Sequence, residues 1–172
     1  MVENIVNGLV GLMGGFLGLP FGKQLIVFII SLMPILELRG GLIAAALLGL
    51  KPVESYIITI IGNIIPVPFI LWFINKVLDF MRNSKSKKLN GIAKWLDKKV
   101  EKHKGQIEKC GFLGLILFVG IPLPGTGAWT GCLVASVLEM DRKKSFFATM
   151  IGIIIASIIM MILSFGVLKN II

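Results

Sequence analysis

Long apolar stretches dominate the pattern of hydrophobic and polar positions along this chain, and they predict helices that cross a membrane. A helical span needs about 20 mainly apolar residues, and Val53–Phe73 and Phe146–Leu168 are the clearest candidates. Pro66 and Pro68 predict a kink within the first of them. A shorter stretch, Ile5–Pro20, has about 16 residues. We expect it either to cross as a short tilted span or to lie as a helix in the membrane interface.

Two further apolar stretches contain residues that break helices. Leu25–Leu50 holds Pro34, two charged residues and a glycine pair, and Phe112–Leu138 holds the run Pro122–Gly127. Proline removes a backbone donor and glycine adds backbone freedom, so we expect neither stretch to be one continuous helix. Irregular backbone at membrane depth is tolerated only where protein or water covers its polar groups. The two breaks therefore predict a cavity and, with it, the functional site.

The broken stretches belong to an internal repeat with an offset of 90 residues. Each unit is a broken stretch followed by an unbroken span. Identities fall at Pro34/Pro124, Gly41/Gly131, Ala45/Ala135, Leu48/Leu138, Ser55/Ser145, Thr59/Thr149, Ile61/Ile151 and Gly62/Gly152. Apolar segments share residues by chance, but matching proline and glycine at both breaks favours a true repeat.

Basic residues gather in one segment between the two units. The chain has 18 Lys and Arg against 9 Asp and Glu, and 11 of the 18 lie within Lys76–Lys109. Apolar residues spaced by three and four from Leu89 to Ile107 predict a basic amphipathic helix. It lies either on anionic membrane lipids or, as the alternative, as a soluble helix against the rest of the protein. Nucleic acid is not expected as a partner, because long apolar runs flank the basic block.

The charge pattern also separates two topologies. Lys and Arg in short loops stay in the cytoplasm, so the basic segment is expected there, in a multi-pass protein of the cell (cytoplasmic) membrane. Complete crossing by both broken stretches would place Arg142–Lys144 on the opposite face. Re-entrant hairpins would place both basic segments on one face and would make the two units antiparallel, as in many secondary transporters. We expect the hairpins, with full crossing as the alternative.

The resulting fold class is an all-α integral membrane protein with an inverted repeat of re-entrant helical hairpin plus transmembrane helix, and a basic amphipathic helix between the repeats. The expected parts are an N-terminal short span or interfacial helix at 1–23, repeat 1 at 24–76 (hairpin 24–50, transmembrane helix 53–75), the cytoplasmic helix at 77–110, and repeat 2 at 111–172 (hairpin 112–139, transmembrane helix 145–168).

Glu37 and Arg39 are the charges at the first break. A charge at the centre of a membrane helix costs on the order of 2.5–3.5 kcal/mol, so such residues are rare and usually functional. Residues two apart point to opposite sides of a helix but share a side of an extended chain. Pro34 and the Gly40–Gly41 pair favour an extended or turn conformation here. The alternative role for the two charges is an intramembrane salt bridge that holds two segments together.

The second break, Pro124-Gly125-Thr126-Gly127, has no charge but offers backbone N–H groups. Such groups attract anions where a half-helix begins; the alternative is a tight turn without a ligand. If the two hairpins face one another, Glu37 and Arg39 must lie close to this second break. Trp129 is expected to line the cavity or to anchor near an interface. Asn63 is expected to bond a hairpin or to join helices. The candidate transport residues are Glu37, Arg39, Gly40, Gly41, Asn63, Pro124, Gly125, Thr126, Gly127 and Trp129.

Catalytic and metal-binding patterns are missing from the sequence. His103 is the only histidine, and Cys110 and Cys132 lack metal-type spacing. There is no Ser-His-Asp set, P-loop or paired-histidine motif. We therefore expect neither an enzyme nor a bound metal or cofactor.

The two breaks together resemble a known family. Pro34-Ile-Leu-Glu37-Leu-Arg39-Gly40-Gly41, followed by Gly120-Ile-Pro122-Leu-Pro124-Gly125-Thr126-Gly127-Ala-Trp129, resembles the small multidrug export proteins and, more distantly, the DedA superfamily. The resemblance covers about Leu25 to Leu168. It implies two facing re-entrant hairpins and, for DedA relatives, proton-coupled movement of phosphate-bearing lipids such as undecaprenyl phosphate. Glu37 and Arg39 would be the membrane-embedded acid and arginine, whereas the second hairpin lacks the arginines of the DedA pattern.

Three functions follow as hypotheses. The leading one is a small transporter that translocates a phosphate-bearing lipid, such as undecaprenyl phosphate or a phospholipid, with proton coupling left open. The second is a proton-coupled exporter of cationic amphiphilic drugs. The third is a structural membrane protein with indirect effects. A homodimer is left open.

Overall fold

All secondary structure in the described part of the chain is helical, in a computed structural model that describes residues 2–84, 86, 88–95, 98, 101, 111–123 and 125–167. The elements are α1 (Val2–Leu12), the 3-10 helix η1 (Gly14–Gly18), α2 (Gly22–Leu32), α3 (Glu37–Leu47), α4 (Pro52–Ile64), α5 (Pro66–Arg82), α7 (Gly111–Gly120), α8 (Ala128–Val137), α9 (Arg142–Met161) and the π-helix η2 (Ile162–Val167). Residues 88–95 are helical as well. The expected all-α fold is confirmed for these residues.

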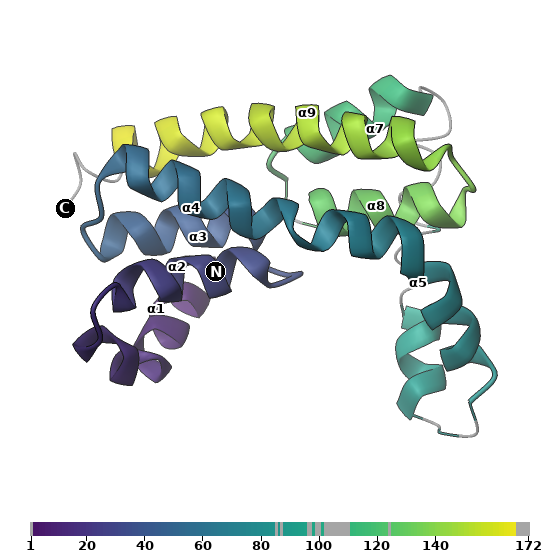
Figure 1. The fold of residues 1–172 in the computed structure, drawn as a ribbon, viewed down its shortest axis with the longest axis horizontal. Coiled ribbons are helices and arrows are strands. Elements are labelled where there is room, and N and C mark those ends of the chain that lie inside the picture. Colours follow the sequence, from purple (N-terminus) through teal and green to yellow (C-terminus); the bar gives the residue numbers. More distant parts are fainter. Residues whose placement is uncertain are drawn as a thin grey trace.

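Two helical hairpins approach each other from opposite ends of the molecule (Figure 1). α2 and α3 form the first hairpin, and its tip, residues 33–36, points to the middle. α7 and α8 form the second, and its tip, residues 121–123 and 125–127, reaches the middle from the other end. α4 packs on the first hairpin and α9 on the second. α4 continued by α5 runs antiparallel to α9 along the length of the molecule.

Helix length separates the long helices from the hairpins. Pro52–Ile74 and Arg142–Gly166, with 23 and 25 residues, are long and apolar enough to cross a membrane. The helix is interrupted at Ile65, directly before Pro66, where a kink was predicted. The hairpin helices and α1 have only 10 or 11 residues each. At 1.5 Å per residue they are about 16 Å long, roughly half of a hydrocarbon core.

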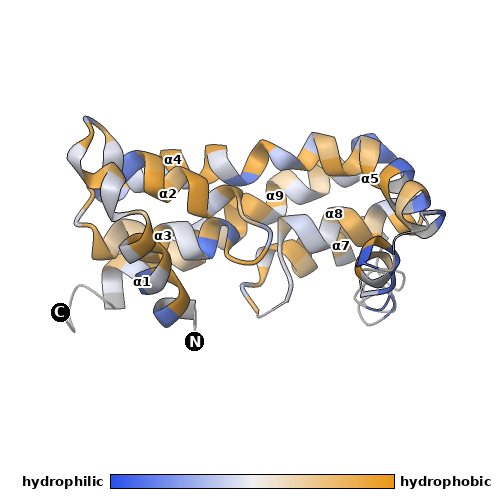
Figure 2. Ribbon diagram, turned by 90° about the horizontal axis from the view of Figure 1, so that it is seen from below, coloured by the Kyte–Doolittle hydropathy of each residue, from blue (hydrophilic) through white to orange (hydrophobic). Residues whose placement is uncertain are grey.

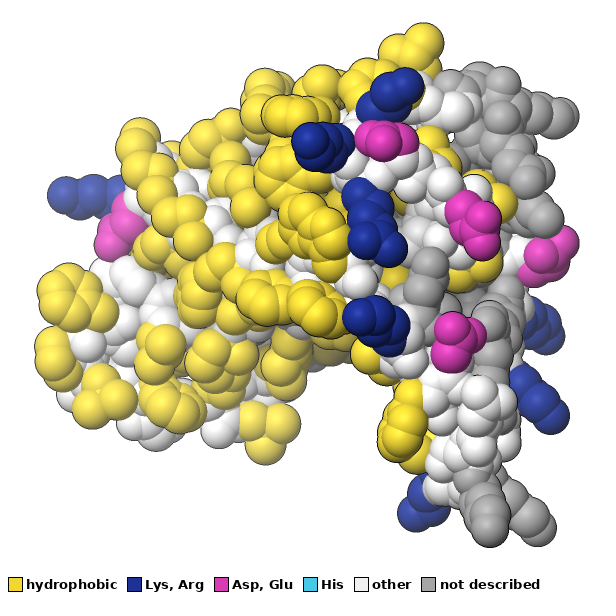
Figure 3. All heavy atoms as spheres, turned by 45° about the vertical axis from the view of Figure 1, so that its right-hand side comes forward, with side chains coloured by type: hydrophobic (Ala, Val, Ile, Leu, Met, Phe, Trp, Pro, Cys, Tyr) yellow, Lys and Arg dark blue, Asp and Glu magenta, His cyan; other side chains and the backbone are white. Residues whose placement is uncertain are grey.

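The surface has an apolar body with charged ends. Large apolar side chains are exposed along the long helices, for example Phe69 at 62% and Ile154 at 49% exposure. Figure 2 shows hydrophobic residues along most of the helices. Charged side chains gather at one end in Figure 3, beside an almost continuous hydrophobic face. Soluble monomers rarely expose an apolar surface of this extent, so the distribution fits contact with lipid.

The two basic segments lie at the same end of the molecule. The C-terminal part of α5 and residues 88–95 lie where α9 begins (Figure 1), and Leu71 of α5 borders the same cavity as Arg142. This arrangement is the one that the hairpin topology predicts. Residues 102–110, which include His103 and Cys110, lie outside the described residues.

The repeated glycines occupy equivalent places in the two halves. Each lies where its helix meets the first helix of its own hairpin, and a Cβ there would collide with one neighbour. Gly41 and Gly62 both meet Ser31 of α2, and Gly131 and Gly152 both meet Val119 of α7. Glycine therefore lets three helices converge on one point in each half.

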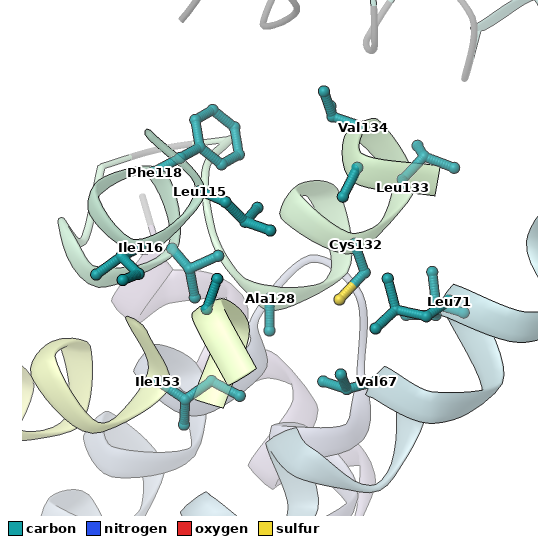
Figure 4. Packing of buried hydrophobic residues seen from close by; sticks show 14 residues of the cluster. Val67, Leu71, Leu115, Ile116, Phe118, Ala128, Cys132, Leu133, Val134 and Ile153 are labelled. Carbon is teal, nitrogen blue, oxygen red and sulfur yellow. The ribbon is translucent and has the colours of Figure 1, made fainter. Parts of the chain in front are cut away.

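The largest hydrophobic cluster holds the second hairpin against the rest of the protein. It joins α5, α7, α8 and α9, and Figure 4 shows Ala128 and Cys132 of α8 facing Val67 and Leu71 of α5. Ala128 is the first residue of α8 and only 1% exposed. The core therefore fixes the beginning of α8 at the centre of the molecule.

Two expectations about local structure are wrong. Glu37–Gly41 is not extended, because α3 begins at Glu37 and continues through both glycines. A Cβ at Gly41 would overlap Ser31 Oγ, so close helix packing explains this glycine; the chain turns earlier, at residues 33–36. The helix expected over 53–75 also continues, after its break, to Arg82. Residues 77–82, which the sequence assigned to the amphipathic helix, therefore belong to α5.

Candidate functional site

Glu37 connects the two hairpin tips through its carboxylate. Its side chain is 5% exposed, and its backbone is left-handed, with φ at 50°. Oε2 accepts a hydrogen bond from the N–H of Ala128 and Oε1 from that of Trp129, each at 3.0 Å. These are the first two N–H groups of α8, which no helical carbonyl can satisfy. The helix dipole also favours an anion at this position.

Arg39 binds the same tip from its other side. Its guanidinium donates to the carbonyl oxygens of Leu123 and Thr126 and to Thr126 Oγ1; the two Thr126 contacts measure 3.0 Å. Thr126 Oγ1 in turn lies 3.0 Å from the carbonyl oxygen of Ile121. The loop between α7 and α8 therefore folds around the guanidinium group of Arg39. The predicted proximity of Glu37 and Arg39 to the second break is confirmed.

Gly127 allows the carboxylate to come this close. Its φ is 130°, a conformation that side chains disfavour. A Cβ at this position would also overlap Glu37 Oε2. Gly125 has a positive φ too, of 88°. Pro124, the remaining candidate of this break, lies outside the described residues.

Asn63 faces a very small cavity beside Glu37. The cavity, of about 10 Å³, is also lined by Arg39 and Gly127 and has room for about one water molecule. Asn63 is 3% exposed, and within the described part of the chain its Oδ1 has no hydrogen-bond partner. An unsatisfied buried acceptor costs about 1–3 kcal/mol. Asn63 is thus an acceptor held next to the buried carboxylate.

Trp129 borders a second and larger cavity. Its indole ring helps to line a space of about 330 Å³, together with Trp95. Its Nε1 is buried and finds no acceptor among the residues that the structure describes. Of the two roles expected for Trp129, lining a cavity is the one observed.

The sequence predicted that N–H groups at the second break attract an anion, with a tight turn without a ligand as the alternative, and the structure shows an anionic side chain of the same chain beside them. Glu37 itself occupies the beginning of α8. Ala128 and Leu123 were missed as site residues, because they contribute backbone atoms and no distinctive side chain. Gly40 and Gly41 support the site through packing and do not line its charged part. Among the described residues there is no cluster of His, Cys, Asp and Glu that could hold a metal.

Residues 37–159 match the protein family described as "Putative small multi-drug export protein". The chain belongs to this family. The matched region begins at Glu37 and contains the second hairpin tip and most of α9. No curated protein and no solved structure matches the chain. Family membership and two long apolar helices together indicate a membrane exporter that takes a small-molecule substrate, which is a transport function and not an enzymatic one.

Proposed function

We propose that this small multidrug export family member moves a phosphate-bearing amphiphile across the membrane, and that Glu37 occupies its anion site in the closed state. The supporting observation is the pair of hydrogen bonds from Ala128 and Trp129 to the Glu37 carboxylate. Two main-chain donors at a helix start and a nearby guanidinium make a site for an anion. A phosphate has the charge and the oxygen atoms to take the place of the carboxylate.

Protonation of Glu37 would open this site. A neutral carboxyl group gives up the charge-assisted part of its two bonds, and such bonds contribute about 1.5–3 kcal/mol each. Its new O–H can donate to Oδ1 of Asn63, which lines the same cavity. The first N–H groups of α8 then become available, and Arg39 can exchange carbonyl oxygens for phosphate oxygens. Proton uptake by Glu37 and substrate binding are thus coupled at one place.

The arrangement of the hairpins supports alternating access. The two units meet at the site and run in opposite directions, as inverted repeats do in many transporters. Helices of 10 or 11 residues suit hairpins that enter and return on one face. The basic end would face the cytoplasm and its anionic lipids. α1, with 11 residues, suits the interface better than a span.

A second candidate is the export of cationic amphiphiles, with Glu37 as the substrate carboxylate. The observation in its favour is that the buried carboxylate contacts Trp129, whose ring lines a cavity together with Trp95, and indole rings attract cations. Against it, Glu37 already accepts two N–H bonds, and Arg39 lies in the same small cavity. A cation would have to approach beside a guanidinium. The geometry therefore favours the anionic substrate.

Vesicles that contain the purified protein test the proposal. Flux of a fluorescent polyprenyl phosphate and of tetraphenylphosphonium is measured with and without a pH gradient. We expect phosphate-lipid movement that depends on the gradient and falls at least tenfold in Glu37→Gln. Glu54→Gln, which changes a carboxylate that accepts a bond from Gln24 near the start of α4, should keep the flux. Gradient-driven movement of tetraphenylphosphonium alone would establish the second candidate, and movement of neither would overturn both.

A further inference from the structure

A larger cavity lies beside the charged site and shares parts with it. Its volume is about 330 Å³, which falls in the range of small-molecule sites. Its walls come from the first hairpin tip, α5, α8 and the helical segment 88–95. The residues used below are Pro34, Ile35, Ile70, Leu133, Trp95 and Trp129.

The chemistry of the cavity is almost entirely apolar. Apart from Thr130 its lining consists of aliphatic side chains, a proline and two indole rings. A ligand that fits must therefore have an apolar body.

Charge near the cavity selects among such ligands. Lys94 directly precedes the lining residue Trp95. It is exposed and belongs to the basic end of the molecule. An anionic head group would find its counter-charge there, whereas a cationic one would be repelled.

Two contacts join the cavity to Glu37. The main-chain N–H of Trp129 holds Glu37 Oε1, and the indole of the same residue lines the cavity. Pro34 and Ile35, which line the cavity, lie in the turn that leads into Glu37. A ligand in the cavity would therefore contact both Trp129, which donates to Glu37, and the turn that precedes Glu37.

We propose that this two-tryptophan cavity binds the apolar chain of a single-chain anionic amphiphile, whose head group lies toward Lys94 before transfer. The proposal rests on the proposed function for what is exported. Binding is nevertheless measured without transport, so failure of one leaves the other to be judged separately.

Tryptophan quenching provides the measurement. The full chain carries Trp72→Phe, which removes the one tryptophan that does not line the cavity. It is placed in phosphatidylcholine nanodiscs and titrated with dodecyl phosphate that is brominated on its chain. We expect saturable quenching that unbrominated dodecyl phosphate reverses.

One variant and a control locate the binding. Ile70→Phe fills the cavity and should weaken binding at least tenfold, whereas Ile154→Phe, on the exposed face of α9, should leave it unchanged. Unfolding temperature is followed for each variant, so that only folded protein is compared.

Three results would overturn the proposal. They are quenching that does not saturate, equal binding by the Ile70→Phe and Ile154→Phe variants, and equally tight binding of a brominated dodecyl-trimethylammonium. The last result would assign the cavity to a cationic ligand. Saturable binding of the phosphate in a protein that moves no lipid would support the cavity and overturn only the function.

Discussion

Glu37 combines several unfavourable features in one residue. Its left-handed backbone costs on the order of 1–3 kcal/mol, and burial of its carboxylate adds a desolvation cost of several kcal/mol. The two charge-assisted bonds to α8 contribute about 1.5–3 kcal/mol each. These contributions oppose one another, and under the proposed function protonation of Glu37 weakens the favourable ones.

Gly127→Ala tests this balance at the residue scale. The added Cβ would overlap Glu37 Oε2, so we expect the carboxylate to leave α8 and the gradient-driven lipid flux to fall at least tenfold. Gly49→Ala is the matched control: Gly49 also has a positive φ, of 68°, but nothing lies within 4 Å of its added Cβ. The flux is measured in the same vesicles. Equal losses in both variants would show that backbone strain, and not contact with Glu37, limits transport.

At the scale of elements, the sequence allows the breaks to be located but not all of their contacts. Pro34 and the Pro124–Gly127 run mark the two tips, and the position of the kink follows from Pro66. The conformation at Gly40–Gly41 could not be predicted, because a glycine pair serves a bend and a close helix contact equally well. Only the packing of Ser31 against Gly41 decides between them. The partner of the α8 N–H groups depends on tertiary structure, which local patterns do not contain.

The beginning of α8 offers a test that changes the backbone alone. Proline is tolerated in the first turn of a helix but has no N–H, so Ala128→Pro removes the donor to Glu37 Oε2. Loss of one such bond should weaken the contact between the tips by about 2 kcal/mol. We expect amide hydrogen exchange in residues 121–127 to accelerate at least tenfold.

Ala128→Ser retains the N–H group and serves as the control for that exchange measurement. Its side chain is nearly as small, so the core around position 128 should tolerate it. Equal exchange rates in the proline and serine variants would mean that the Ala128–Glu37 bond does not hold the tips together.

On the scale of the whole molecule, sequence alone predicts two antiparallel units and a common end for both basic segments. The all-helical fold, the meeting of the tips and the common end of the basic segments are observed (Figure 1), whereas the inverted repeat stays a prediction. The side of the membrane on which the basic end lies is still a prediction, since it depends on the lipid and the potential. Charge counts carry that information, whereas helix packing does not.

Cysteine labelling in cells tests the orientation. Single cysteines at Lys88 and Lys143, both exposed, should react only with reagents from the cytoplasmic side. A cysteine at Lys51, at the end where α4 begins, should react from outside. The background is Cys110→Ser with Cys132→Ala. Labelling of positions 88 and 143 from opposite sides would contradict the hairpin topology.

The donors that hold Glu37 belong to the main chain, and this has a consequence for genetics. Every residue except proline encodes an N–H group, so small substitutions at position 128 keep the contact intact. A saturation mutagenesis screen would then report an essential acid without an essential partner. Co-variation among related sequences would likewise not pair position 37 with position 128. The contact would be visible in such a screen at Gly127 instead, because any side chain there would overlap the Glu37 carboxylate and no substitution would be tolerated.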